Sequence, residues 1–238
     1  MGGLGLSVLI VTHDAASEIG PCLAYLTGSE IGRSCEIVVV DNGSRDGTGQ
    51  IVAGRWPEVH LVAGRRGHGV AGGTALAFAA SRGRYLLLLA PNVLLIDPGT
   101  VAGLIEGLDA RPEAGAVGLR LVADGGAGAA PGRLAAAVRS LGIGPRGAAT
   151  VGGASEACLM IRREAACPAG ASPLFLGGGT WPARLRGAGW GVEVLPRLEA
   201  IQLGRSVSAL PARVRRERRS GTAQACTVTE ISERRRAP

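Results

Sequence analysis

The first half of the chain alternates short apolar runs with polar or small-residue segments. Four runs have the length and the β-branched or leucine-rich composition of buried strands: residues 6–12, 36–40, 60–63 and 85–89. The segments between them predict helices: 17–26, capped by Ser17; 48–55; and one opening in the glycine-rich stretch 64–73 and ending near residue 82. Strands and helices in this alternation predict an α/β fold, a three-layer sandwich with a mostly parallel central sheet.

The second half has a weaker pattern. Here we expect helices at 98–108 and 181–187, and strands at 116–122, 157–162 and 192–195. The stretch 123–150 is rich in Gly, Ala and Arg, and is expected to be a mobile loop with one helix around 134–141. The chain is therefore divided into one domain, 1–205, and an Arg-rich tail, 206–238, expected to be disordered.

The positive charge is concentrated at the end of the chain. All 26 basic residues are arginine, and with 19 acidic residues they give a net charge of +7. Residues 211–238 hold eight Arg and three Glu, and so contribute five of these seven charges. The body is then near neutral, and no nucleic-acid partner is expected. The alternative to a merely disordered tail is contact with an anionic membrane surface or an acidic partner.

Cysteine usage and hydropathy bear on the cellular location. The five cysteines form no C-x-x-C pair, and their odd number in a long chain favours a reducing compartment over a disulfide framework. The apolar start, 1–11, has no basic region before it, and the longest apolar run, 85–90, is too short to cross a bilayer. We therefore expect a cytoplasmic protein, peripheral at the inner membrane face if the tail binds lipid.

Polar residues follow three of the predicted strands, at the edge where parallel sheets bind ligands. These residues are Thr12, His13 and Asp14 after the first strand, Asp41, Asn42 and Gly43 after the second, and Asn92 after the fourth. A carboxylate at a strand end, such as that of Asp41, can accept hydrogen bonds from a base or a ribose. Asp46 lies just before a predicted helix and is expected to cap it instead.

These segments, in this order, resemble the family 2 glycosyltransferases. The resemblance rests on VTHD at 11–14, VDNGSRDGT at 40–48, GVAGG at 69–73, LLLLAPNV at 86–93, ACLMIRRE at 157–164 and RLRGAGW at 184–190. It covers roughly residues 6–206 and implies a GT-A-like fold that binds a nucleoside-diphosphate sugar. By family analogy, Thr12 and Asp41 would contact the nucleotide base and ribose, and the sugar would pass to an acceptor with inversion.

The chain departs from the family at the positions where a metal ligand and a catalytic base are expected. The metal-binding acid corresponds to Asn92, whose neutral amide would hold Mg²⁺ or Mn²⁺ weakly, so metal use is doubtful. The family's E-D-x-D base segment corresponds to 177–180, which contains only Gly and Thr, and a later family histidine corresponds to Gln202. Glu156 is the nearest candidate for a substitute base.

Three functions stay open. The first is a glycosyltransferase with weak or no metal dependence, in which arginine could neutralise the diphosphate; the candidates are Arg65, Arg66, Arg120, Arg146 and Arg205. The second is a catalytically inactive relative that binds a nucleotide or a partner as a scaffold. The third is an NAD-binding oxidoreductase, because 67–72 matches G-x-G-x-x-G, although 87–90 lacks the acid expected about 20 residues further on.

Overall fold

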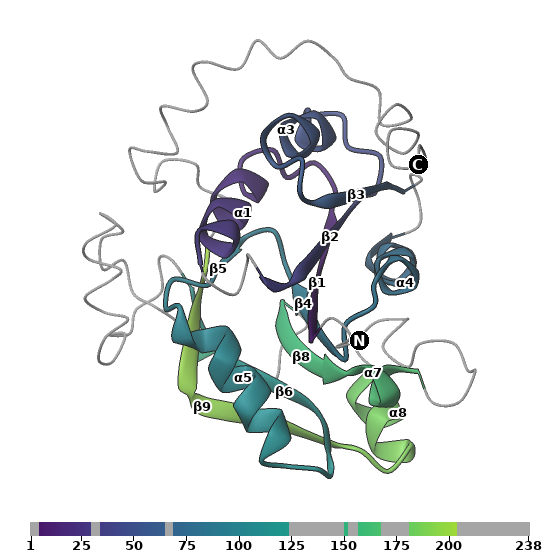
Figure 1. Ribbon diagram of the computed structural model, residues 1–238, viewed down its shortest axis with the longest axis vertical. Coiled ribbons are helices and arrows are strands. Elements are labelled where there is room, and N and C mark those ends of the chain that lie inside the picture. The colour runs from purple at the N-terminus through teal and green to yellow at the C-terminus, as the bar shows by residue number, and fades with distance from the viewer. Residues whose placement is uncertain are drawn as a thin grey trace.

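The described part of the chain forms one mixed sheet between two layers of helices (Figure 1). The computed structural model describes residues 5–29, 34–64, 69–123, 150–151, 157–167 and 181–203. The strands are β1 (Leu6–Thr12), β2 (Glu36–Asp41), β3 (His60–Ala63), β4 (Tyr85–Leu89), β5 (Val93–Leu94), β6 (Ala114–Ala123), β7 (Thr150–Val151), β8 (Cys158–Arg162) and β9 (Gly191–Gln202). The helices are α1 (Ile19–Gly28), α3 (Thr48–Arg55), α4 (Gly69–Ala80), α5 (Gly99–Asp109), α7 (Arg163–Ala166) and α8 (Trp181–Gly187).

The sheet order is β3-β2-β1-β4-β8-β6-β9-β5, with β7 paired to β6. β3, β2, β1 and β4 are all parallel, because each is reached from the previous strand through a helix. β8 is antiparallel to both β4 and β6, and β6 is parallel to β9. As a result β6 and β9 run in the direction of β4, and their carboxyl ends reach the same edge of the sheet as those of β1 and β2.

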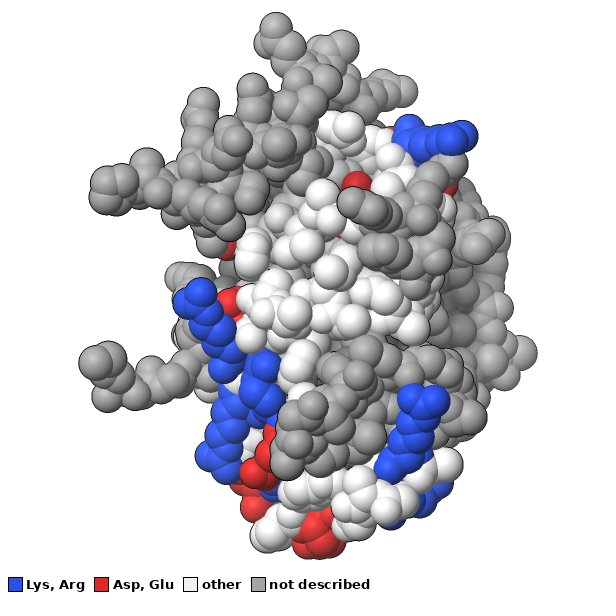
Figure 2. Space-filling view, turned by 90° about the vertical axis from the view of Figure 1, so that its right-hand side faces the viewer, with Lys and Arg blue, Asp and Glu red and all other residues white. Residues whose placement is uncertain are grey.

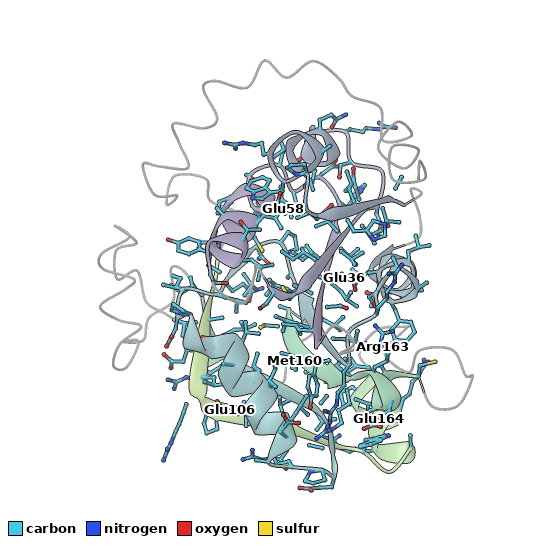
Figure 3. The ribbon with its side chains drawn as sticks, viewed as in Figure 1. Glu36, Glu58, Glu106, Met160, Arg163 and Glu164 are labelled. Carbon is cyan, nitrogen blue, oxygen red and sulfur yellow. The ribbon has the colours of Figure 1, made fainter. Side chains whose placement is uncertain are left out.

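Apolar residues fill both faces of the sheet. One core cluster joins the sheet to α1, α3 and α5, and the other joins it to α4, α7 and α8. Met160, labelled near the centre of Figure 3, is fully buried in the middle of β8. Strands that are covered on both faces have continuous apolar sequences, such as YLLLL in β4. The predicted α/β fold with three layers is confirmed, and the antiparallel pairings of β8, β5 and β7 make the sheet mixed.

Most predicted elements occur close to their expected bounds. β1, β3, β4, α3 and α8 begin and end where the sequence predicts, whereas β9 extends seven residues past the expected end at 195. α1 begins at Ile19, and Ser17 does not cap it, because its hydroxyl donates to the Glu18 carboxylate. β5, β7 and α7 were not expected. The predicted helix at 134–141 and the tail, 206–238, lie outside the described residues.

No helix in the described ranges is both long and apolar enough to cross a membrane.

Candidate functional site

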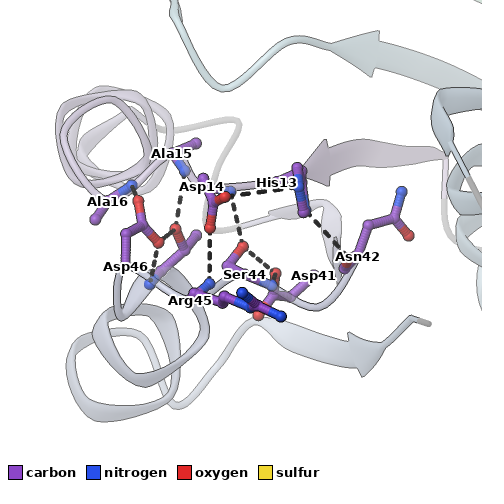
Figure 4. Close-up of polar contacts among 10 residues, drawn as sticks. His13, Asp14, Ala15, Ala16, Asp41, Asn42, Ser44, Arg45 and Asp46 are labelled. Carbon is purple, nitrogen blue, oxygen red and sulfur yellow. Dashed lines mark hydrogen bonds and ion pairs between the residues drawn. The ribbon is translucent and has the colours of Figure 1, made fainter. Parts of the chain in front are cut away.

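The polar strand ends predicted from the sequence meet at one edge of the sheet. Thr12 and Asp41 are register partners in β1 and β2, and Asp41 is in turn paired with Ala63 of β3. Two backbone hydrogen bonds continue this alignment past the strands, from Asn42 N to Thr12 O at 2.9 Å and from Gly64 N to Asp41 O at 2.8 Å. The loops after β1 and β2 therefore lie side by side, as Figure 4 shows.

The two oxygens of the half-buried Asp41 carboxylate have different surroundings. Oδ1 accepts hydrogen bonds from the Ser44 hydroxyl and from the Ser44 amide, the latter at 3.1 Å. Oδ2 faces the first turn of α3, where a Cβ added to Gly49 would lie 2.6 Å from it. No hydrogen bond from the described residues reaches Oδ2. One oxygen thus fixes the carboxylate and the other stays available as an acceptor.

Thr12 and Asn42 are buried and shape the floor of the site. Thr12 is 1% exposed, and its hydroxyl lies 3.4 Å from the Val40 carbonyl. Asn42 is 5% exposed; its amide donates to the Gly69 carbonyl at the start of α4 at 2.8 Å, and its Oδ1 is buried with no hydrogen-bond partner. α4 can pack this closely because a Cβ at Gly73 would lie 2.9 Å from the Asn42 amide nitrogen.

His13 and Asp14 are the exposed residues of this edge. Their side chains are 51% and 43% exposed, with the His13 Nε2 3.6 Å from the Asp14 carboxylate. The His13 Nδ1 lies 3.2 Å from the Asn42 carbonyl, which orients the ring. The Asp14 amide donates to the Ser44 hydroxyl at 3.0 Å, and the Asp14 carboxylate accepts the Arg45 amide at 2.7 Å. The backbone amide and the carboxylate of Asp14 therefore both bond the loop after β2 to the loop after β1.

Gly43 and Asp14, in the loops at this edge, have left-handed backbone conformations. Gly43 has a φ of 75°, which glycine adopts without strain, and the sharp turn it allows brings Ser44 back to Asp41. Asp14 has a φ of 50°, an uncommon conformation that aspartate tolerates better than most residues. The hydrogen bonds of Asp14 to the neighbouring loop hold it there.

Asp46 lies one residue before Gly47, the N-cap of α3, and its side chain bonds both the start of that helix and the loop after β1. Its Oδ1 accepts the amide of Thr48, the first residue of α3, at 3.0 Å, and its Oδ2 accepts the Ala16 amide at 2.8 Å. Burial opposes ionisation of this carboxyl, but hydrogen bonds from the Thr48 hydroxyl and from both amides outweigh it, so its pKa is lowered below the ordinary value. Asp46 therefore links α3 to the loop after β1.

Asn92, at the place of the family's metal-binding acid, is engaged with the end of β9. Its side-chain amide donates to the Leu203 carbonyl at 3.0 Å, and the Leu203 amide donates to the Asn92 carbonyl at 2.7 Å. Gln202, at the place of the family's histidine, pairs with Val93 on the adjacent strand. These neutral side chains do not fit a divalent metal, and the described ranges hold no group of three or more His, Cys, Asp or Glu that could bind one.

The other candidates from the sequence divide into two groups. Arg120 lies on β6 and forms an ion pair with Glu199 of β9, so its charge is already matched. Glu156, Arg65, Arg66, Arg146, Arg205 and the segment 177–180 lie outside the described residues. Sequence reasoning missed Ser44 and Gly49, the two residues that fix Asp41. The serine stands in an Asx-turn pattern, D-N-G-S, which could have indicated it, whereas nothing local marks the glycine.

Among the described residues, the centre of the side that carries α4 shows few charged side chains. Figure 2 faces this side, and its charged side chains lie mainly towards the lower end, among the described residues. This agrees with the sequence of α4, GVAGGTALAFAA, in which no residue is charged. Helix α4 therefore contributes no charged side chain to this side of the molecule.

Comparison with known proteins identifies the fold. The chain matches the profile of "Glycosyl transferase family 2" over residues 7–167. No curated protein sequence matches it. Among solved structures it is similar to the mannosyltransferase PcManGT from Pyrobaculum calidifontis, in complex with GDP-Man and Mn²⁺, with 18% identity and a TM-score of 0.61 over 94% of this chain and 66% of that chain.

Two further structures have the same fold. S. aureus TarS 1–349 in complex with UDP-GlcNAc is 14% identical with a TM-score of 0.61, over 92% of this chain and 68% of that chain. Mannosyl-3-phosphoglycerate synthase from Rubrobacter xylanophilus is 17% identical with a TM-score of 0.54, over 92% and 77%. The chain spans 66% of the mannosyltransferase and 60% of another TarS 1–349 structure. These likenesses confirm the GT-A-like fold implied by the sequence.

Proposed function

We propose that this chain, which belongs to glycosyl transferase family 2, binds a nucleoside-diphosphate sugar at the carboxyl edge of its sheet. The observation that carries the proposal is Asp41, a half-buried carboxylate with Oδ1 held by Ser44 and Oδ2 left as an acceptor. A base or ribose offers the N–H or O–H donors that such a fixed carboxylate accepts. Proteins of this fold have been solved with GDP-Man and with UDP-GlcNAc, which supports this class of ligand.

The remaining proposed contacts come from the two neighbouring loops. Thr12 and Asn42 form the floor, Gly43 and His13 line the edge, and Asp14 holds the two loops together. Asn92 lies in the loop after β4, where the diphosphate is expected. Because the Asn92 amide is bonded to Leu203 and carries no charge, binding is proposed to need little or no Mg²⁺ or Mn²⁺.

Thermal unfolding with UDP, GDP, dTDP and NAD, each with Mn²⁺ and with EDTA, tests the binding proposal. A ligand at 100 times its dissociation constant stabilises the fold by about 2.7 kcal/mol, which raises the melting temperature of a chain this size by roughly 5–10 °C. We expect such a shift with a nucleoside diphosphate in EDTA. A shift that requires Mn²⁺ would refute the metal independence, and a shift with NAD alone would replace the proposal with an oxidoreductase.

Sugar transfer is the activity proposed for the bound donor, with Glu156 as the candidate base. Release of the nucleoside diphosphate from a donor sugar, with and without acceptors, measures it, and Glu156→Gln is expected to lower it at least a hundredfold. Nucleotide binding without any turnover would identify the chain as a catalytically inactive scaffold. Asp41→Ala should abolish binding in either case, and an unchanged affinity in this variant would remove Asp41 from the site.

The Arg-rich tail, 206–238, is proposed to contact an anionic surface at the cytoplasmic face of the membrane. Its sequence concentrates the net positive charge, and such clusters are attracted to anionic lipids by about 1 kcal/mol per basic residue. Co-sedimentation with vesicles containing phosphatidylserine should therefore be strong for the full chain, weak for the chain 1–205, and reduced by added salt. Equal sedimentation of both chains would end this proposal.

A further inference from the structure

A series of hydrogen bonds joins the loop after β1 to the Asp41 carboxylate (Figure 4). The Asp14 amide donates to the Ser44 hydroxyl at 3.0 Å, and this hydroxyl contacts Oδ1 of Asp41. An amide N–H can only donate and an ionised carboxylate can only accept, so the hydroxyl proton points towards Asp41. The three groups therefore form a directed series of contacts, which we call the Asp14–Ser44–Asp41 relay.

Ser44 sets the orientation of the Asp41 carboxylate. Within the described ranges, the hydrogen bonds to this side chain come from the Ser44 hydroxyl and, at 3.1 Å, from the Ser44 amide. Both reach Oδ1, so rotation of the carboxylate about its Cβ–Cγ bond would break them. Oδ2 is thereby held in one direction, next to Gly49 in the first turn of α3. Without the hydroxyl, the amide alone would hold the carboxylate, and Oδ2 would be less precisely placed.

Asp14 has an unusual backbone conformation at the other end of the relay. Its φ of 50° is the one positive value at a non-glycine residue in the described ranges. Its side chain is 43% exposed, so core packing does not impose this conformation. Aspartate tolerates it because its carboxylate can bond nearby backbone, and here the carboxylate accepts the Arg45 amide at 2.7 Å. A strained residue beside a binding site points to a function, and this one directs its amide at Ser44.

We propose that Asp14 and Ser44 are positioning residues for the donor nucleotide, which orient the free oxygen of Asp41 through the relay without touching the ligand. This inference rests on the proposed function, because it assumes that a nucleoside diphosphate binds at Asp41. It adds that the loop after β1 controls nucleotide affinity through the loop after β2. The affinity should then depend on two residues that the ligand does not contact.

Calorimetric titration of the full chain with UDP and GDP in EDTA tests the role of Ser44. Ser44→Ala removes the hydroxyl and should weaken nucleotide binding about tenfold, the usual effect of losing a hydrogen bond to a charged group. Ser44→Thr keeps a hydroxyl and should restore most of the affinity. Equal affinities for Ser44→Ala and the wild type, or no recovery in Ser44→Thr, would overturn the proposal.

Asp14→Asn and Asp14→Ala form a matched pair that separates positioning from direct contact with the ligand. Both remove the charge, but asparagine tolerates the left-handed conformation and keeps an acceptor for the Arg45 amide, whereas alanine does neither. Asp14→Asn should therefore bind nucleotide like the wild type, and Asp14→Ala about tenfold more weakly. An Asp14→Asn variant as weak as Asp14→Ala would show that the charge acts on the ligand, and positioning would be refuted.

A double variant with Asp14→Ala and Ser44→Ala tests whether the two residues act through one relay. Its loss of affinity should be close to that of Ser44→Ala alone, and additive losses would refute the relay. The control, Asp46→Asn, weakens another contact between the same two loops that does not reach Asp41, so it should lower stability and leave affinity unchanged. A wild type that binds neither UDP nor GDP would refute the proposed function itself. Wild-type affinity in both Ser44→Ala and Asp14→Ala would refute this inference alone.

Discussion

At the end of β2, the position of the Asp41 carboxylate depends on the absence of a side chain at Gly49. An added Cβ would lie 2.6 Å from Oδ2, well inside contact distance. Gly49→Ala should therefore displace the carboxylate and weaken nucleotide binding about tenfold, and the strain should lower the free energy of unfolding by about 1–3 kcal/mol. Titration with the nucleoside diphosphate and chemical denaturation measure the two effects.

Gly54 provides the matched control for this residue. It lies in the same helix, α3, and an added Cβ there would meet no atom within 4 Å. Gly54→Ala should raise the free energy of unfolding by about 0.5–1 kcal/mol, because alanine loses less conformational entropy in a helix, and should leave binding unchanged. If both variants bind nucleotide with the affinity of the wild type, nucleotide binding does not depend on the observed position of the Asp41 carboxylate.

The lowered pKa of Asp46 makes stability depend on pH. Its ionised form accepts the amides of Ala16 and Thr48, so it stabilises the fold at pH values above the ordinary carboxyl pKa of 3.8. This stabilisation is lost as the pH falls through the lowered pKa. Denaturation curves from about pH 6 to about pH 3 should show a smaller loss of stability in Asp46→Asn than in the wild type. Parallel curves for the two proteins would contradict the assignment.

At the scale of elements, Arg162 joins β8 to α5 and β6 at the sheet edge opposite the site. It is 6% exposed; its guanidinium donates to the carbonyls of Leu108 at the end of α5 and of Ala114 at the start of β6, at 2.5 and 3.0 Å. Arg162→Met removes both guanidinium hydrogen bonds, although the Leu108 carbonyl keeps the Arg111 amide as a donor at 2.9 Å, and should lower the free energy of unfolding by about 2–4 kcal/mol.

The binding site should not be affected by this change. Arg162 pairs with Tyr85, the first residue of β4, and so lies a full strand length from Asn92. Nucleotide affinity of Arg162→Met should therefore equal that of the wild type well below its melting temperature. Arg186→Ala, an exposed position on α8, is the stability control and should stay within about 0.5 kcal/mol. A loss of affinity in Arg162→Met would show that the two edges of the sheet are coupled.

At the scale of the whole molecule, the described core is complete by Leu203. Both apolar clusters are built from residues up to Ala200, and the last strand ends at Gln202. The sequence predicts that the tail, 206–238, adds nothing to this core, so the chain 1–205 should melt within about 2 °C of the full chain. Calorimetry of the two chains in the same buffer measures this. A drop of 5 °C or more would place part of the core in 206–238 and refute the predicted domain boundary.

Local patterns were sufficient to predict most of the sheet and the turn that follows β2. Runs such as LSVLIVT and YLLLL have the length and the apolar composition of buried strands, and β1 and β4 have the predicted bounds. The string VDNGSRDGT carries its own turn chemistry, so the arrangement of Asp41, Gly43 and Asp46 could be anticipated. β5 and β7 have two residues each, and no local pattern predicts so short a strand.

What the sequence determined by itself is the α/β alternation and the polar residues at the strand ends, because both depend on neighbours along the chain. Tertiary structure alone decided what Asn92 does, since its partner Leu203 is 111 residues away and carries no sequence signal of a contact. The same is true of Gly49. Its lack of a side chain is required only because the Asp41 carboxylate lies against the first turn of α3. Such contacts form only when distant segments come together in the sheet, and the local sequence pattern around each residue does not predict them.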